Sequence, residues 1–272
     1  MLQTRRREIG KQLQELLKKR EQKRGLLIAF EGPDGSGKTT QRKHFTTWLQ
    51  GEGLNVVTTK WNSAPLIQPL VKARKRAKAL SPREFSLIHA AEFRYRLDTQ
   101  ILPALWRGNT VVADRHFFTG LARDAARGMD TDWLLQVYAP LFFPDIVYYF
   151  RVSADVSAKR IAADGDPKYY EAGQDVTGLE DPHHSYTTFL NRVIQEYDSL
   201  AKIFRFVTLD GEQPIFQLHK QIRETYQKHQ EKRSWADWNK EAVLDWLSNH
   251  PEVLEAKPTK VTAKLADEDD DA

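Results

Sequence analysis

Eight consecutive residues have the types and spacing of a loop that holds phosphate groups. Residues 32–39 read Gly-Pro-Asp-Gly-Ser-Gly-Lys-Thr, which fits the pattern G-x-x-x-x-G-K-[ST]. In such a loop, backbone N–H groups surround the phosphates, the lysine reaches the β- and γ-phosphates, and the last hydroxyl can ligate Mg²⁺. The sequence therefore predicts binding of a nucleoside polyphosphate through Gly32, Pro33, Asp34, Gly35, Ser36, Gly37, Lys38, Thr39 and Thr40.

A second candidate site follows the apolar run at residues 110–114, Thr-Val-Val-Ala-Asp. A strand here presents the Asp114 carboxylate at the carboxyl edge of a parallel sheet, where ligands of such sheets bind. We expect Asp114 to hold Mg²⁺ together with Thr39, and Arg115 to clamp a second phosphate with its guanidinium fork. Lys38, Asp114 and Arg115 are therefore the candidate catalytic residues.

The elements that position these side chains alternate along the chain. Short apolar or β-branched runs predict strands, and the longer stretches between them predict helices, so the fold class is α/β. We expect a parallel five-stranded sheet of the P-loop NTPase type, with helices on both faces and helical extensions at both termini. The strands are expected at 26–31, 55–59, 110–114, 145–152 and 204–209, and the helices near 38–50, 82–107, 117–128, 153–163, 185–202 and 214–230.

Composition shifts divide the chain into four parts. Residues 1–24 form a basic N-terminal helix with nine Lys/Arg against three Glu, and 25–230 form the nucleotide-binding core. Residues 231–250 have the pattern of a C-terminal amphipathic helix, and 251–272 that of a disordered acidic tail. Solvated charge explains both charged ends, and contact between the basic helix and nucleic acid is the alternative.

The bulk composition excludes several classes of protein. The chain of 272 residues has no cysteine, so a disulfide framework and thiolate metal sites are excluded. No apolar run approaches the roughly 18 residues of a membrane span, and the N-terminus lacks the apolar stretch of a secretory signal. We therefore expect a cytoplasmic protein that does not contact membranes.

The loop and the later landmarks together resemble the thymidylate kinase family. Residues 30–41, Phe-Glu-Gly-Pro-Asp-Gly-Ser-Gly-Lys-Thr-Thr-Gln, closely resemble its phosphate loop, and Asp114-Arg115-His116 stands where the family has Asp-Arg-aromatic. Residues 144–152 look like its fourth strand, and the resemblance spans roughly 25–228. It implies Mg²⁺-dependent phosphoryl transfer from ATP to a nucleoside monophosphate, with dTMP to dTDP as the first choice.

The same resemblance implies a role for individual residues. Lys38 and the loop amides would hold the donor phosphates, and Asp34 matches the carboxylate that contacts the acceptor sugar. Residues 164–184 are expected to form a mobile loop, and the part at 165–175 sits where such kinases carry a lid over the donor. The acceptor site would comprise Asp34, Lys60, Arg94, Arg115 and Arg123, and the lid cations would be Arg160 and Lys168.

The base-reading positions of the family differ in this chain. The arginine that reads the thymine ring aligns near Phe93, with Arg94 and Arg96 as possible substitutes, and Arg123-Asp124 replaces a Tyr-Gln pair. Base contacts strongly affect which acceptor is used, because they leave buried polar groups unpaired with the wrong ligand. The identity of the acceptor base therefore stays open.

Two other functions and one assembly state remain to be considered. Cations at 72–78 could track a polyanion, as in a kinase that uses polyphosphate as its donor. The basic arm and the cation-poor lid also fit a nucleotide-binding regulatory module without catalysis. The family resemblance further favours a homodimer formed through helices such as 82–107.

Overall fold

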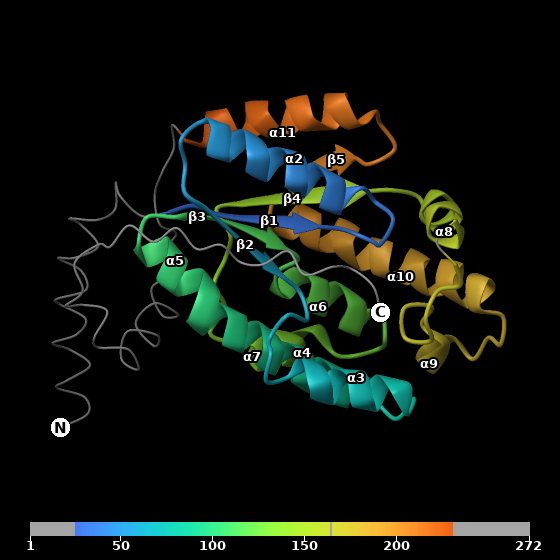
Figure 1. Cartoon of the computed structure of the whole chain (residues 1–272). Coiled ribbons are helices and arrows are strands. Elements are labelled where there is room, and N and C mark those ends of the chain that lie inside the picture. Colours follow the sequence, from blue (N-terminus) through green and yellow to red (C-terminus); the bar gives the residue numbers. More distant parts are fainter. Residues whose placement is uncertain (1–24, 164, 231–272) are drawn as a thin grey trace, which may run out of the picture.

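A parallel sheet of five strands forms the centre of the protein (Figure 1). The structure is a computed structural model that describes residues 25–163 and 165–230. The strand order is β2-β3-β1-β4-β5, which confirms the predicted α/β fold class. The strands are β1 (Leu27–Glu31), β2 (Val56–Lys60), β3 (Thr110–Asp114), β4 (Ile146–Arg151) and β5 (Val207–Asp210).

Helices cover both faces of this sheet. Ile28 and Phe30 of β1 pack in one apolar cluster with residues of α2 (Lys38–Gly51) and α11 (Ile215–Gln230). Leu27 and Ala29, which point the other way, join a larger cluster under the helices of the opposite face (Figure 1). All five residues of β1 are buried, as expected for the central strand of a doubly covered sheet.

The structure has helices at the predicted places and also contains helices that were not predicted. The expected helix at 82–107 is interrupted by a π-helical turn at Leu97–Ile101. Neither α3 nor α7 was expected from the sequence. In chain order, the α-helices other than α2 and α11 are α3 (Gln68–Arg76), α4 (Pro82–Arg96), α5 (Leu102–Trp106), α6 (Phe117–Ala125), α7 (Thr131–Tyr138), α8 (Ala154–Ala162), α9 (Gln174–Thr177) and α10 (Pro182–Ile203).

Two segments differ from their predicted limits for local reasons. The helix expected from 185 begins at Pro182, because the Asp181 side chain caps it by accepting a hydrogen bond from the His184 amide at 2.6 Å. The segment 164–184, expected as a loop, contains α9, and its Tyr170 and Ala172 are buried.

The parallel register brings the candidate site together. Phe30 of β1 is paired with Asp114 of β3, and Asp114 is paired in turn with Lys60 of β2. The carboxyl ends of three strands therefore meet next to the loop that follows Glu31. The predicted terminal segments 1–24, 231–250 and 251–272 lie outside the described residues. Within the described ranges, no helix combines the length and apolarity needed to cross a membrane.

Candidate functional site

The glycine loop has the backbone conformation that its sequence predicts. Gly32 has a φ of 134°, and a Cβ there would lie 2.6 Å from the carbonyl oxygen of Phe150 in β4. Gly37 has a φ of 84° and forms the N-cap of α2. Only glycine fits these two positions without strain, so the loop can wrap closely around an anion at the start of α2.

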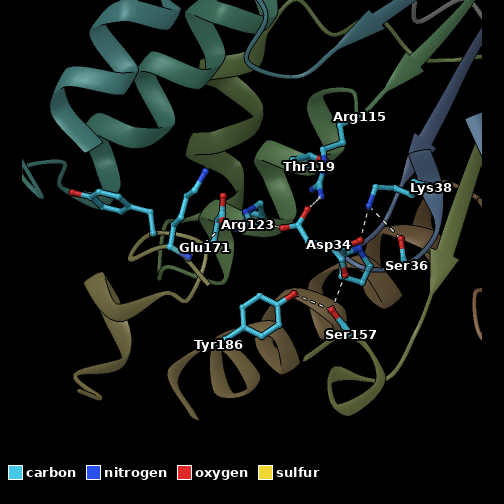
Figure 2. A network of polar contacts seen from close by, with 12 residues as sticks. Asp34, Ser36, Lys38, Arg115, Thr119, Arg123, Ser157, Glu171 and Tyr186 are labelled. Atoms are coloured by element: carbon cyan, nitrogen blue, oxygen red, sulfur yellow. Dashed lines mark hydrogen bonds and ion pairs between the residues drawn. The ribbon is translucent and has the colours of Figure 1, made fainter. Parts of the chain in front are cut away.

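Lys38 folds back over this loop (Figure 2). Its ammonium group donates hydrogen bonds to the Pro33 carbonyl oxygen and, at 3.2 Å, to the Ser36 hydroxyl. Burial and, after it, the nearby Arg115 lower the pKa of Lys38 to about 7, although Asp34 and Asp114 act in the opposite direction. The Lys38 amine therefore gains a proton when phosphates bind, because their negative charge favours the ammonium form.

Asp114 and Thr39 have the chemistry of a magnesium site. Asp114 ends β3 and lies 3.4 Å from the Nε of Arg42 on α2, and Thr39 is the second residue of that helix. Mg²⁺ prefers oxygen ligands and is usually held by one or two protein groups together with waters and substrate phosphates. The carboxylate and the hydroxyl therefore fit this ion. Among residues 25–163 and 165–230, no cluster of three or more His, Asp or Glu side chains forms an all-protein metal cage.

Asp34 joins the phosphate loop to two arginines (Figure 2). One carboxylate oxygen pairs with Arg115, and the other accepts a hydrogen bond from Arg123 on α6 at 3.1 Å. Burial alone would raise the pKa of Asp34, but Arg115, Arg123 and Lys38 outweigh it and hold the pKa well below its usual range. Three predicted acceptor residues, Asp34, Arg115 and Arg123, thus form one charged group beside the loop.

Glu31 is a site residue that the sequence analysis did not single out. Its buried carboxylate accepts hydrogen bonds from the His116 amide at 2.7 Å, the Thr119 hydroxyl at 2.6 Å and the Tyr197 hydroxyl at 2.9 Å. Burial raises its pKa, and these bonds partly oppose the effect. The signal in the sequence was a carboxylate that ends an otherwise apolar strand.

Helix α8 braces the phosphate loop from the other side. Ser157 donates a hydrogen bond to the Asp34 carbonyl oxygen at 2.6 Å and contacts the Tyr186 hydroxyl at 2.8 Å (Figure 2). Arg160 donates to the carbonyl oxygens of Gly35 at 2.9 Å and Gly211 at 3.2 Å. Arg160, predicted as a lid cation, therefore contacts the loop directly, whereas Lys168 is exposed in the segment after α8.

Arg127 anchors that segment to the acceptor side. Its buried guanidinium pairs with Asp175 at 2.9 Å and donates to the Tyr170 carbonyl oxygen at 2.7 Å. The Tyr170 hydroxyl in turn accepts a hydrogen bond from the Leu80 amide at 2.8 Å. The expected lid thus has fixed points on the end of α6 and on the loop before α4.

Two other predicted acceptor residues come from β2 and α4. Arg94 pairs with Asp98 at 2.8 Å along its own helix, and the exposed Lys60 ends β2 in register with Asp114. Arg96 is instead the buried arginine of α4. It pairs with Glu92 at 3.0 Å, donates to Thr59 at 3.0 Å and lies 5.2 Å from the centre of the Trp61 ring.

The arrangement suits the transfer of a phosphoryl group. Such a transfer needs positioning and neutralisation of charge more than it needs a covalent intermediate. The loop supplies backbone N–H groups, Lys38 supplies a cation, and Arg115 and Arg123 supply two guanidinium groups beside them.

The comparisons with known proteins agree with this geometry. The family model for thymidylate kinase matches residues 30–222. A protein of Saccharolobus solfataricus named probable thymidylate kinase 2 is 37% identical over 202 residues, covering 74% of this chain and 94% of that protein. A probable thymidylate kinase of Pyrococcus horikoshii is 35% identical over 151 residues, covering 52% of this chain and 72% of its own length. A thymidylate kinase of Xanthomonas oryzae is 37% identical over 151 residues, covering 54% and 65%.

Proposed function

The chain belongs to the thymidylate kinase family, and we propose that it transfers the γ-phosphoryl group of ATP to the 5′-phosphate of dTMP. The bond between the β,γ-bridging oxygen and the γ-phosphorus breaks, and a bond forms from that phosphorus to an acceptor phosphate oxygen. The products are ADP and dTDP. The observation that carries the proposal is the charged group in which Asp34 of the phosphate loop meets Arg115 and Arg123.

The proposed roles follow from where each side chain lies. The loop amides and Lys38 bind the donor phosphates, and Arg160 steadies the loop through Gly35. Arg115 and Arg123 hold the acceptor phosphate, which is already an anion and needs no general base. Thr39 and Asp114 would hold Mg²⁺, which would neutralise negative charge on the donor phosphates.

The segment after α8 completes the proposal as a lid. Lids exclude water and bring cations to the transferring group. The contacts of Arg127 with Asp175 and Tyr170 support such a role, because they connect this segment to the helix that carries Arg123. Lys168 is the cation that the lid would add, since it is exposed on that segment.

A panel of acceptors tests the proposal. The purified full chain is given ATP and Mg²⁺ with each of the common nucleoside and deoxynucleoside monophosphates, and diphosphate formation is measured. We expect dTMP to have the highest kcat/KM, with Lys38→Ala as the inactive control. If no acceptor is phosphorylated, the proposed kinase activity is refuted. Transfer from long-chain polyphosphate but not from ATP would refute ATP as the phosphoryl donor.

A further inference from the structure

We propose that Lys75 on α3 is an acceptor-binding residue whose ammonium group contacts the phosphate of the nucleoside monophosphate. The inference rests on the function proposed above, because it adds one group to the same acceptor site. Lys75 belongs to the run of cations at 72–78, which the sequence alone does not separate from one another.

Lys75 is the member of this run that turns toward the charged group beside the loop. Arg74 is paired with Glu84, with its Nε 2.9 Å from a carboxylate oxygen, and Lys78 lies 4.7 Å from the Tyr169 ring. Lys72 is exposed. Lys75 is half-buried, and its ammonium nitrogen lies 5.0 Å from the centre of the Phe85 ring.

The buried ring of Phe85 brings Lys75 close to the cations of the acceptor side. The guanidinium of Arg127 lies 4.6 Å from the centre of the same ring. Arg127 in turn donates a hydrogen bond to the Arg123 carbonyl oxygen at 3.1 Å, one helical turn away. Lys75 therefore approaches from α3 the region that Arg123 approaches from α6.

The charges around Lys75 favour the binding of an anion. Burial, followed by the positive charges of Arg123 and Arg127, lowers the pKa of Lys75 to about 8. Glu171 and Asp34 oppose it without restoring the ordinary value. A further titratable neighbour is His89 on α4, whose own pKa is lowered well below its usual value by burial and by Lys75. A phosphate dianion among these cations relieves their repulsion and favours the charged form of Lys75.

Binding without catalysis tests the proposal most directly. The affinity of the full chain for dTMP is measured by calorimetry in the absence of donor, and thymidine serves as the probe without a phosphate. We expect Lys75→Ala to weaken dTMP binding by about tenfold or more and to change thymidine binding by less than about twofold. Lys72→Ala is the matched control on the same helix and should leave dTMP affinity within about twofold. Equal dTMP affinity of Lys75→Ala and the wild type would overturn the proposal.

The pH dependence of the wild type provides a readout that needs no unstable variant. Because Lys75 loses its proton near pH 8, dTMP affinity should fall about three- to tenfold between pH 7 and pH 9. Lys75→Arg keeps its charge over this range, so its dTMP affinity should match the wild type at pH 7 and stay level. An identical fall in Lys75→Arg would assign the titration to another group and contradict the proposal.

Thermal stability separates a binding role from a structural one. A Lys whose folded-state pKa is depressed destabilises the folded protein fully at pH values below that pKa. For Lys75 this penalty declines as the pH rises from about 8 toward the ordinary value of 10.5. Lys75→Met keeps an apolar side chain next to Phe85 and removes the ammonium charge that Arg123 and Arg127 repel. It should therefore raise the melting temperature by roughly 2–4 °C at pH 7. The gain should shrink at pH 9.5. A lower melting temperature together with weaker thymidine binding would mean that Lys75 is structural.

These measurements also separate the two proposals from each other. A wild-type chain that binds dTMP but never phosphorylates it refutes the proposed function, and the binding comparison still decides the role of Lys75. A chain that phosphorylates dTMP equally well with and without Lys75 refutes only the role of Lys75.

Discussion

Glu31 and His116 are joined by a hydrogen bond of 2.7 Å from the His116 amide to the Glu31 carboxylate. Glu31 ends β1 immediately before the phosphate loop, and His116 follows the Asp114-Arg115 pair after β3. This bond, together with the pairing of β1 with β3, therefore joins the donor loop to the predicted metal and acceptor residues. It is buried, so water cannot replace it without cost.

Removing the Glu31 carboxylate should affect both stability and turnover. Glu31→Ala leaves the buried His116 amide without its partner, and we expect a loss of about 1–3 kcal/mol in the free energy of unfolding. Glu31→Gln keeps an acceptor for this amide and should lose less. Urea denaturation and kcat measure the two effects. Equal stability of the alanine variant and the wild type would contradict the assigned bond.

Donor binding should take up a proton at Lys38. The pKa of Lys38 is about 7 in the free protein, and bound phosphates should raise it toward its ordinary value. At pH 8 the uptake should therefore approach one proton per ATP, measured by calorimetry in buffers of different ionisation enthalpy. Lys38→Met should remove this uptake and cut kcat by about 10²-fold or more. A binding enthalpy that does not depend on the buffer would contradict the prediction.

The free energy of unfolding should also follow the proton on Lys38. The folded-state pKa of about 7 lies below the value of 10.5 for the unfolded chain. The unfolded state therefore binds more protons between these values, and stability should rise with pH across this window. Lys38→Met should lose this part of the pH dependence, which urea denaturation at pH 7 and pH 9 can measure.

Asp114→Asn should weaken the dependence of activity on Mg²⁺. The substitution keeps the shape of the side chain but removes the charge that faces Arg42 and the predicted metal. We expect kcat to fall on the order of 10²-fold and half-saturation to need more Mg²⁺. The control is Asp210→Asn, because Asp210 ends β5 of the same sheet. This substitution should change kcat by less than about twofold. Wild-type Mg²⁺ dependence in Asp114→Asn would remove Asp114 from the metal site.

Gly173 and Gly178 offer a matched pair of substitutions on either side of α9. Their φ values are 69° and 71°, so alanine is strained at both by roughly 1–2 kcal/mol. A Cβ at Gly173 would also lie 2.3 Å from the Phe189 ring, whereas at Gly178 it meets nothing within 4 Å. Gly173→Ala should therefore lower the melting temperature clearly more than Gly178→Ala. Equal shifts would mean that the packing against Phe189 is not maintained.

The central strands β1, β3 and β4 were predictable because they are buried on both faces. Runs such as 110–114 are apolar along their whole length, and the observed β3 has the predicted limits. The last strand was placed too early, at 204, because Phe204 and Arg205 look like strand residues but lie at the end of α10. Tertiary packing, rather than local preference, decided that boundary.

The missed elements lack the pattern on which the sequence analysis depended. Within α3 only Val71 is buried, so no apolar stripe marks it as a helix. In contrast, α7 carried a usable signal, since Asp130 caps it by accepting a hydrogen bond from the Trp133 amide at 2.8 Å.

Candidate site residues could be proposed from the sequence where a fixed spacing carries the chemistry. The loop from Gly32 to Thr39 falls in this class, and so does the Asp114-Arg115 pair. Lys75 and Glu31 could not be assigned, because their partners come from segments far away in the sequence. Which cation of 72–78 faces the site depends on how α3 lies against α4, and no local pattern encodes that.

Under the proposed function, the pairing of Asp34 with Arg115 and Arg123 makes this carboxylate an internal competitor of the acceptor phosphate. The carboxylate is attached to the same chain, so its effective concentration at these guanidinium groups is far above that of a free metabolite. Under the proposed function, the apparent affinity for the acceptor is the intrinsic affinity reduced by the fraction of molecules in which the carboxylate is still bound. Under the same proposal, the Asp34 carboxylate takes the place of the nucleotide phosphate at the two arginines when the product leaves.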